Sequence, residues 1–184
     1  MFERIKARIG RMRLGDELKN VQRDKAFFNI SEVKTVGISF EFTTAEDFEL
    51  LRKYINYLRD QKKKVKALGY YSTKEEPAVQ YSKVEFDFYG KKSLDWTGRA
   101  SGHIVQNFID EPFDLLLDLN DGKSFALYCI GGLSRASFKI GRFEEDGEHL
   151  HDLLIDSPAE KGLKYFLRQV DIYLQLINSP ASEI

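Results

Sequence analysis

Hydrophobic and polar positions repeat along this chain with two periods, and segments of one period alternate with segments of the other. Residues 36–42 place an apolar side chain at every second position, which is the period of a strand. Residues 44–64 then repeat apolar residues every three or four positions, with Thr44 and Asp47 spaced as in a capping box. We predict a strand followed by a helix whose solvent-facing last turn is formed by the lysines at 62–64.

The same exchange continues to the end of the chain. Further strands are predicted at 65–71, 84–88, 113–119, 138–142 and 153–155, and further helices at 104–109, 125–133 and 163–177. The connection before the strand at 84–88 is too short for a helical crossover, so this strand is expected to be antiparallel or to follow a single turn. The leucine-rich strand 113–119 predicts burial on both faces and a central place. We predict a single three-layer α/β domain with a mostly parallel sheet flanked by helices.

A basic segment, residues 1–25, precedes this domain. It carries eight basic and four acidic groups, a net charge of +4, whereas the remaining 159 residues carry a net charge of -5. We divide the chain into an amphipathic N-terminal arm (1–25), one α/β domain (26–178) and a frayed tail (179–184). The arm has an apolar stripe at helical spacing, formed by Phe2, Ile5, Ile9 and Met12. We expect the stripe to dock on the domain or the arm to be mobile, with a membrane surface or phosphates as alternatives.

Composition narrows the class of protein. With 184 residues, of which 42% are hydrophobic and 31% charged, the chain is long and apolar enough to fold as one domain. A net charge of -1 gives no overall signature for nucleic acid, and the single cysteine, Cys129, excludes an internal disulfide. No apolar stretch is long enough to span a bilayer, and no apolar segment follows the basic start. We therefore expect a cytoplasmic protein without a transmembrane segment.

Candidate ligand-binding residues lie where the predicted strands end, because open α/β sheets bind ligands beyond the carboxyl ends of their strands. They are Thr43, Thr44, Asp118, Asn120, Asp121 and Arg142. The two threonines could hold a phosphate at a helix N-terminus, and capping explains them equally well. The cluster at 118–121 has the oxygen groups of a hard-cation or general-base site, but turn formation favours the same residue types.

Other motifs are incomplete. Gly122-Lys123-Ser124 ends like a phosphate-binding loop, but the first glycine of that motif would fall at Leu117. The chain contains neither G-x-G-x-x-G nor G-x-S-x-G. His149 and His151, beside Asp152, have a spacing that suits a shared metal ion, yet a surface loop explains them better. We predict no metal and no cofactor.

A mixed basic and aromatic surface is a further possibility. Lys91, Lys92, Arg99 and Trp96, with several tyrosines, have the composition of a site for single-stranded nucleic acid. Ordinary packing of aromatic side chains under a long loop is the favoured interpretation, so no nucleic-acid partner is expected.

Two resemblances follow from particular segments. The order of Leu68-Gly-Tyr-Tyr71, Lys92-Ser-Leu-Asp-Trp96, Phe113-Asp-Leu-Leu-Leu-Asp-Leu119, Ser134-Arg-Ala-Ser-Phe-Lys-Ile-Gly141 and Asp152-Leu-Leu-Ile155 resembles a small uncharacterised bacterial family, a domain of unknown function. That resemblance covers nearly the whole chain from about Asn29 onward and implies a compact cytosolic α/β domain. Residues 113–142 also resemble the N-terminal half of heptosyltransferase-like glycosyltransferases, in which a strand, a helix and an Ala-x-x-x-Ile-Gly strand follow in that order. This second resemblance implies sheet topology only.

The leading hypothesis is a non-enzymatic interaction or regulatory domain. Its arm would contact an unknown protein partner through Phe2, Arg4, Arg8 and Arg11. The alternative is a small enzyme or ligand-binding domain that uses the carboxyl edge of the sheet for a phosphate- or sugar-containing ligand. Peripheral attachment of the arm to a membrane surface is a weaker third hypothesis.

Overall fold

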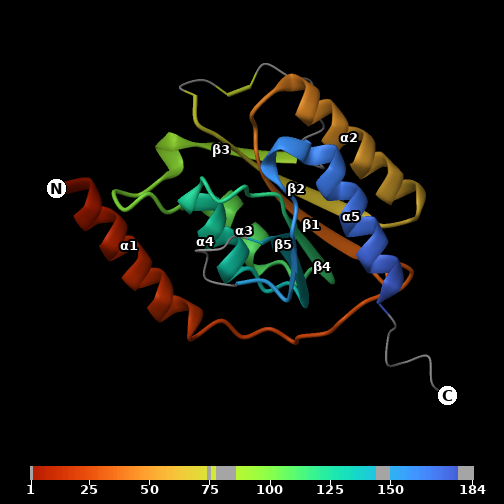
Figure 1. Ribbon diagram of the computed structural model, residues 1–184. Helices are drawn as coiled ribbons and strands as arrows, with labels where there is room; N and C mark the ends of the chain where they lie inside the picture. Colours follow the sequence, from red (N-terminus) through yellow and green to blue (C-terminus); the bar gives the residue numbers. More distant parts are fainter. Residues whose placement is uncertain (1, 74–75, 78–85, 144–149, 178–184) are drawn as a thin grey trace.

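A single sheet of six strands, all parallel, forms the centre of the protein in the order β3-β2-β1-β4-β5-β6 (Figure 1). The computed structural model describes residues 2–73, 76–77, 86–143 and 150–177, and of residues 2–4 and 159 only the backbone. The strands are β1 (Thr35–Glu41), β2 (Lys64–Tyr71), β3 (Phe86–Gly90), β4 (Leu115–Asp118), β5 (Phe138–Arg142) and β6 (Leu153–Ile155). The predicted α/β class is confirmed, and the strand order is that of doubly wound nucleotide-binding folds. The predicted frayed tail at 179–184 lies outside the described residues.

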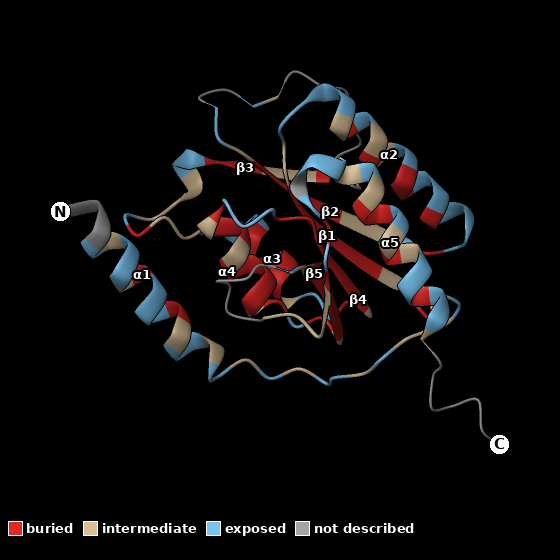
Figure 2. Cartoon of the chain, viewed as in Figure 1, coloured by how far each residue is buried: buried red, intermediate tan, exposed pale blue. Residues whose placement is uncertain are grey.

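Five α-helices are found in the described part of the chain: α1 (Phe2–Leu18), α2 (Ala45–Asp60), α3 (His103–Asp110), α4 (Phe125–Leu133) and α5 (Gly162–Leu176). Helices α2 and α5 cover one face of the sheet, where they pack on alternate residues of β1 such as Ile38 and Phe40. Helices α3 and α4 cover the other face, and α1 lies outside them (Figure 2). Strand β4 lies at the centre of the sheet with every residue buried, as its leucine run predicts.

The orientation of β3 corrects an expectation from the sequence. Strand β3 pairs with β2 in parallel, from Ala67 opposite Phe86 to Tyr71 opposite Gly90. Of the two expected entries the antiparallel one is wrong, because it assumed that a parallel strand needs a helical crossover, and the single turn would fall mostly outside the described residues. The connecting residues 72–85 could extend up to about 45 Å, whereas an eight-residue strand such as β2 measures only about 26 Å.

The lysines at 62–64 do not form a solvated helix end, which also corrects the prediction. Helix α2 ends at Asp60, and Lys62 adopts a left-handed conformation with φ of 63°. That conformation turns the chain directly into β2. Lys63 is buried, and its Nζ donates a hydrogen bond of 2.5 Å to the carbonyl oxygen of Ile30. Only a tertiary contact of this kind separates a buried lysine from its solvated neighbours.

Helix α1 packs against α4, but not through the apolar stripe that the sequence predicts. The buried residues of the contact are Gly10 and Leu14, and a Cβ on Gly10 would lie only 3.0 Å from the ring of Phe125. The two helices approach so closely that the side of α1 that carries Gly10 faces α4, since a larger side chain there would crowd Phe125. The stripe residues Ile5 and Met12 are exposed on the opposite side of the helix. No helix in the described residues is long and apolar enough to span a membrane.

Candidate functional site

A cavity of about 320 Å³ opens at the carboxyl edge of the sheet, between the first turns of α2 and α5. The ends of β1 and β5 and the loop after β4 form its floor, so it lies at the point where the strand order reverses. Its lining residues are Phe40, Glu41, Phe42, Thr43, Thr44, Asp47, Phe48, Leu51, Leu119, Asp121, Lys123, Arg142, Gly162 and Leu163. The structure thus brings together Thr43, Thr44, Asp121 and Arg142 from the six predicted residues.

Asp118 and Asn120 do not line this cavity, which corrects the predicted cluster at 118–121. Side chains alternate along β4, so Asp118 faces α4 while Leu119 faces the cavity side. The buried Asn120 folds into the turn after β4. Its side-chain amide donates to the carbonyl oxygen of Ser124 at 3.1 Å and its oxygen accepts from the Ser124 backbone at 3.3 Å. Turn formation therefore explains Asn120.

Arg142, the last residue of β5, contributes an incompletely paired guanidinium to the cavity. Its Nη1 donates to the backbone oxygen and the hydroxyl of Ser157, at 3.1 and 3.2 Å. Its Nε is buried and has no hydrogen-bond partner among the described residues, and the guanidinium carbon lies 4.5 Å from the ring centre of Phe166. Burial lowers the pKa of Arg142 and the nearby Asp121 opposes that shift. An arginine nevertheless stays charged, and among the described residues Arg142 forms no ion pair.

Glu41, Asp121 and Lys123 supply further charges around the cavity mouth. Burial raises the pKa of Glu41, and the negative charge of Asp121 adds to that effect. Lys123 pairs with Asp121 across the loop after β4, and this hydrogen bond raises the pKa of Lys123. Glu41 was not among the residues predicted for the site. Its position at the end of an alternating strand indicates that it lies at the carboxyl edge of the sheet.

The two helices that begin at the cavity differ in charge. Thr44 caps α2 by accepting the backbone N–H of Asp47 at 3.0 Å, and the Asp47 carboxylate accepts the hydroxyls of both Thr43 and Thr44 at 3.1 Å. With Glu46, two carboxylates already occupy the first turn of α2, so an anion would be repelled there. No side chain caps α5, and its first turn holds no acidic residue. An anion is therefore favoured at the α5 side of the cavity, beside Arg142.

A buried polar chain lies on the opposite face of the sheet, below α4. The hydroxyl of Ser39 donates to Asp118 at 2.9 Å, and Nε2 of His151 lies 3.0 Å from the other oxygen of Asp118. The ring of His151 is accommodated because Gly141 has no side chain, since a Cβ there would lie 2.7 Å from it. The side chain of His151 is therefore largely buried, and the prediction that it belongs to a surface loop was wrong. His149, its proposed partner on a metal, lies outside the described residues.

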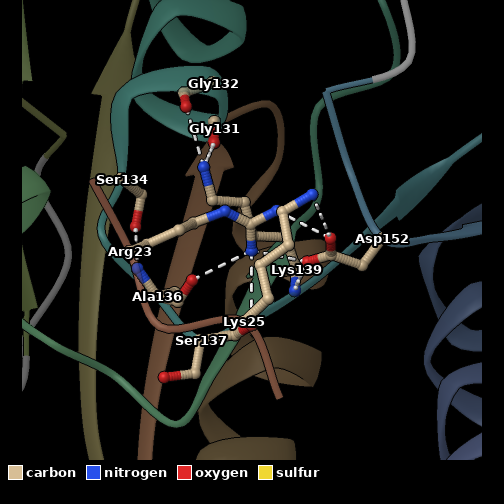
Figure 3. Close-up of polar contacts among 9 residues, drawn as sticks. All are labelled: Arg23, Lys25, Gly131, Gly132, Ser134, Ala136, Ser137, Lys139 and Asp152. Carbon is tan, nitrogen blue, oxygen red and sulfur yellow. Dashed lines mark hydrogen bonds and ion pairs between the residues drawn. The ribbon is translucent and has the colours of Figure 1, made fainter. Parts of the chain in front are cut away.

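A second polar cluster fastens the segment after α1 to the ends of β5 and β6 (Figure 3). Arg23 donates to both carboxylate oxygens of Asp152 at 2.6 Å and to the carbonyl oxygens of Ala136 and Ser137 at 3.1 and 3.2 Å. Burial alone would raise the pKa of Asp152, but hydrogen bonds from Arg23 and its charge outweigh that effect and lower it. Because Arg23 and Asp152 pair with each other and with the backbone, we interpret this arrangement as structural.

Lys139 completes this cluster from within β5. Its side chain is 1% exposed and its Nζ donates to the carbonyl oxygens of Gly131 and Gly132, at 2.9 and 2.7 Å, at the end of α4 (Figure 3). Burial lowers the pKa of Lys139 to about 7, with a further contribution from Arg23. Cys129, one turn earlier on α4, is buried as well. Burial raises the pKa of its thiol to about 12, which makes it an unreactive core residue.

The fold and the cavity together define a doubly wound α/β domain with an open pocket at its topological switch point. Residues 6–177 match the model of a family of unknown function, DUF6913, and the chain belongs to that family. This agrees with the first resemblance drawn from the sequence. No curated protein and no solved structure shows a significant match to the chain, and the resemblance to heptosyltransferase-like enzymes stays a prediction.

Proposed function

We propose that the protein binds a small ligand that carries an anionic group, hydroxyl groups and a flat apolar ring, as a nucleoside monophosphate does. The observation that carries this proposal is Arg142, a guanidinium at the cavity with a buried, unpaired Nε and no carboxylate partner among the described residues. A buried donor without an acceptor is unfavourable, so a ligand oxygen placed there would remove that penalty. Arginine is also well suited to an anion, because its planar guanidinium can donate to two oxygens of a phosphate or carboxylate at once.

The other walls of the cavity suit the remainder of such a ligand. Phe42 and Phe48, whose ring centres are 5.7 Å apart, present an aromatic surface at one side. The carboxylates of Glu41 and Asp121 are acceptors for sugar hydroxyls at the other side. A volume of about 320 Å³ falls at the lower end of the range for small-molecule sites. These features favour a mononucleotide or sugar phosphate over a dinucleotide.

Ligand binding takes precedence over the interaction domain that the sequence favoured. The arm residues Arg8 and Arg11 are exposed, and the side chains of Phe2 and Arg4 lie outside those described. Neither Arg8 nor Arg11 lines the cavity at the sheet edge, whereas Arg142 combines that shaped site with a donor unpaired among the described residues. Removal of residues 1–25 would no longer test an arm contact cleanly, because it would also delete Leu14 and Arg23 from the folded domain.

A thermal-shift series tests the proposal with four probes: AMP, adenosine, ribose 5-phosphate and inorganic phosphate. A ligand at a hundred times its Kd stabilises the folded state by about 2.7 kcal/mol, which for a chain of this size is a rise in Tm of about 5–10 °C. We expect AMP to exceed adenosine, because only AMP carries the anion for Arg142.

Two variants identify the contact. Arg142→Met should remove the difference between AMP and adenosine, and Arg142→Lys should restore only part of it because lysine lacks the planar fork. Arg168→Met is the matched control, since Arg168 is an exposed arginine on α5, the helix that begins at the cavity. An AMP-induced shift that survives unchanged in Arg142→Met, or equal shifts with AMP and adenosine, would contradict the proposal.

A further inference from the structure

The outward face of α1 combines apolar and basic side chains that the domain leaves uncovered. Met12 and Ile5 are 63% and 49% exposed, although they belong to the stripe that the sequence predicted to be docked. Arg8 and Arg11 are exposed along the same helix and form no ion pair with any described residue. The name outer face is used for six residues: Ile5, Arg8, Arg11, Met12, Arg13 and Trp96.

The loop before α3 extends this face. Trp96 is 53% exposed and lies beside α1, where the guanidinium carbon of Arg13 is 5.4 Å from the centre of the indole ring. The contact between Gly10 and this loop is close as well, since a Cβ at Gly10 would meet the carbonyl oxygen of Thr97 at 3.2 Å. The outer face therefore unites an indole, two aliphatic side chains and three arginines from two segments of the chain.

Two acidic residues of α1, Asp16 and Glu17, do not neutralise these arginines, because they are paired elsewhere, and the side chain of Glu3 lies outside those described. Asp16 accepts a hydrogen bond from the amine of Lys19 at 2.9 Å, and the two carboxylate oxygens of Glu17 accept hydrogen bonds from Nη1 and Nη2 of Arg99. Residues 1–25 carry a net charge of +4 against -5 for the rest of the chain. A molecule with this separation of charge turns its basic side toward an anionic surface.

We propose that the outer face binds the surface of an anionic membrane, with α1 lying in the interface plane. Arginines attract anionic headgroups, and a tryptophan with aliphatic neighbours is the combination that enters the interfacial region of a bilayer. The proposal does not rest on the ligand cavity, which lies at the carboxyl edge between α2 and α5. Single-stranded nucleic acid fits less well, because its sites stack bases on several aromatic rings and the outer face presents one.

Co-sedimentation of the full chain with phosphatidylcholine vesicles, with and without phosphatidylglycerol, provides the test. Trp96 is the only tryptophan and reports directly on the outer face. We expect binding to the anionic vesicles only, a blue shift of tryptophan emission and protection from acrylamide quenching. Arg8→Gln/Arg11→Gln should weaken binding at least about tenfold, since each basic side chain near an anionic surface contributes roughly fivefold.

A matched pair of double variants separates the outer face from a general effect of charge. Ile5→Asp/Met12→Asp should abolish binding, because it places carboxylates where apolar side chains would enter the interface. Ile172→Asp/Leu176→Asp makes the same chemical change at exposed residues of α5 and should leave binding intact. All four positions are exposed, so circular dichroism should be unchanged in both.

Three outcomes would overturn the proposal. Equal binding to neutral and anionic vesicles would exclude recognition of charge. An equal loss in the α5 control would show that added negative charge, rather than the outer face, explains the effect. Absence of vesicle binding, together with a dimer in sedimentation velocity that Ile5→Asp/Met12→Asp dissociates, would assign this face to a second copy of the chain.

Discussion

Arg23 and Arg142 are two arginines near the C-terminal strands, and they differ in how the protein pairs their charge and their hydrogen-bond donors. Arg23 donates four hydrogen bonds, two of them to the carboxylate of Asp152, so that its charge and its donors are matched within the protein (Figure 3). Arg142 donates two hydrogen bonds, both to the neutral residue Ser157, and its buried Nε has no partner in the described part of the chain. Both side chains pack in the same domain, but of the two only Arg142 has a buried donor without a partner among the described residues.

The difference separates a structural arginine from one prepared for a ligand. A charged group in the interior is tolerated when an opposite charge and hydrogen bonds compensate its desolvation, as they do for Arg23. Arg142 has two hydrogen bonds and the charge of Asp121, which does not offset its burial, but no ion pair among the described residues. It lies at the rim of a cavity, where an anion from solution would supply the missing counter-charge. Local rules of satisfied polar groups are broken mainly at functional sites, and Arg142 is such an exception.

The same contrast holds along one strand. Lys139 and Arg142 are three residues apart on β5, and the intervening backbone directs them to opposite faces of the sheet. Lys139 points below α4 and donates to two carbonyl oxygens at the end of that helix. Arg142 stands at the open edge. The face on which each side chain projects and its distance from the end of the strand therefore decide which cation joins the core and which reaches the cavity.

The largest expected effect comes from breaking the satisfied pair. Asp152→Ala leaves Arg23 buried without a counter-charge and should lower the free energy of unfolding by about 3–5 kcal/mol. Urea denaturation followed by circular dichroism measures it. The exposed Asp156 is the control, and Asp156→Ala should change stability by less than about 0.5 kcal/mol.

A second variant shows whether the effect comes from the unpaired charge. Arg23→Met/Asp152→Leu replaces the pair by apolar side chains and should recover most of the loss, since buried ion pairs are often replaceable by well-packed hydrophobic residues. If Asp152→Ala alone remained within about 1 kcal/mol of the wild type, the pair would not hold the arm to the sheet.

The next effect concerns Lys139 and is a dependence on pH. Burial lowers the pKa of Lys139 to about 7 in the folded protein, with Arg23 and Lys25 lowering it and Asp152 and Asp118 raising it. Between that pH and the ordinary lysine pKa, the unfolded chain holds the additional proton, so stability rises as pH rises. Below about pH 7 both states hold the proton and this slope vanishes.

The comparison with Lys139→Met isolates this slope. From about pH 7 to 8.5 the wild type should gain up to about 1 kcal/mol per pH unit relative to the variant. Cys129 is present in both proteins, so the effect of its ionisation in the unfolded chain, which has the opposite sign, cancels in this comparison. Parallel stability curves for the two proteins would mean that the carbonyl oxygens of Gly131 and Gly132 keep the folded amine charged.

The sequence predicted the fold well where a period of hydrophobic residues determines the element. Strands such as β5 and helices such as α4 begin and end where the pattern places them, because burial of one face selects the conformation. The errors occurred where a distant partner decides. The hydrogen bond of Lys63 to Ile30 joins residues far apart in the chain, and periodicity carries no information about it.

The candidate site was predictable to the level of the sheet edge. Parallel strands share one carboxyl edge, so Thr43, Thr44, Asp121 and Arg142 could be placed there together. The sequence could not show that Asp118 faces the other layer, since that depends on the register of β4 against β1. Nor could it show which ridge of α1 docks, because a glycine that permits close approach leaves no hydrophobic signal.

Arg142→Met should affect stability far less than Asp152→Ala. The variant loses two hydrogen bonds to Ser157 but keeps an apolar side chain against Phe166, so we expect a loss of about 1 kcal/mol. The same urea titration measures it, and the variant remains folded enough for the ligand tests. A loss as large as that of Asp152→Ala would show that Arg142 is structural and would erase the contrast between the two arginines.

The smallest expected effect is a gain of stability at the cavity mouth. Burial and the charge of Asp121 raise the pKa of Glu41, so the folded protein disfavours its carboxylate. Glu41→Gln should therefore raise Tm slightly at pH 7, because the neutral amide removes the charge that the folded protein disfavours. As pH falls through the raised pKa toward the ordinary value, the wild type takes up a proton in the folded state and the difference should vanish. A thermal series from pH 7 to 4 measures this, with Glu49→Gln on the exposed face of α2 as the control. If Glu41 serves ligand hydroxyls at a cost in stability, Glu41→Gln should show this gain. If the carboxylate is needed for folding, the variant should have a lower Tm at every pH.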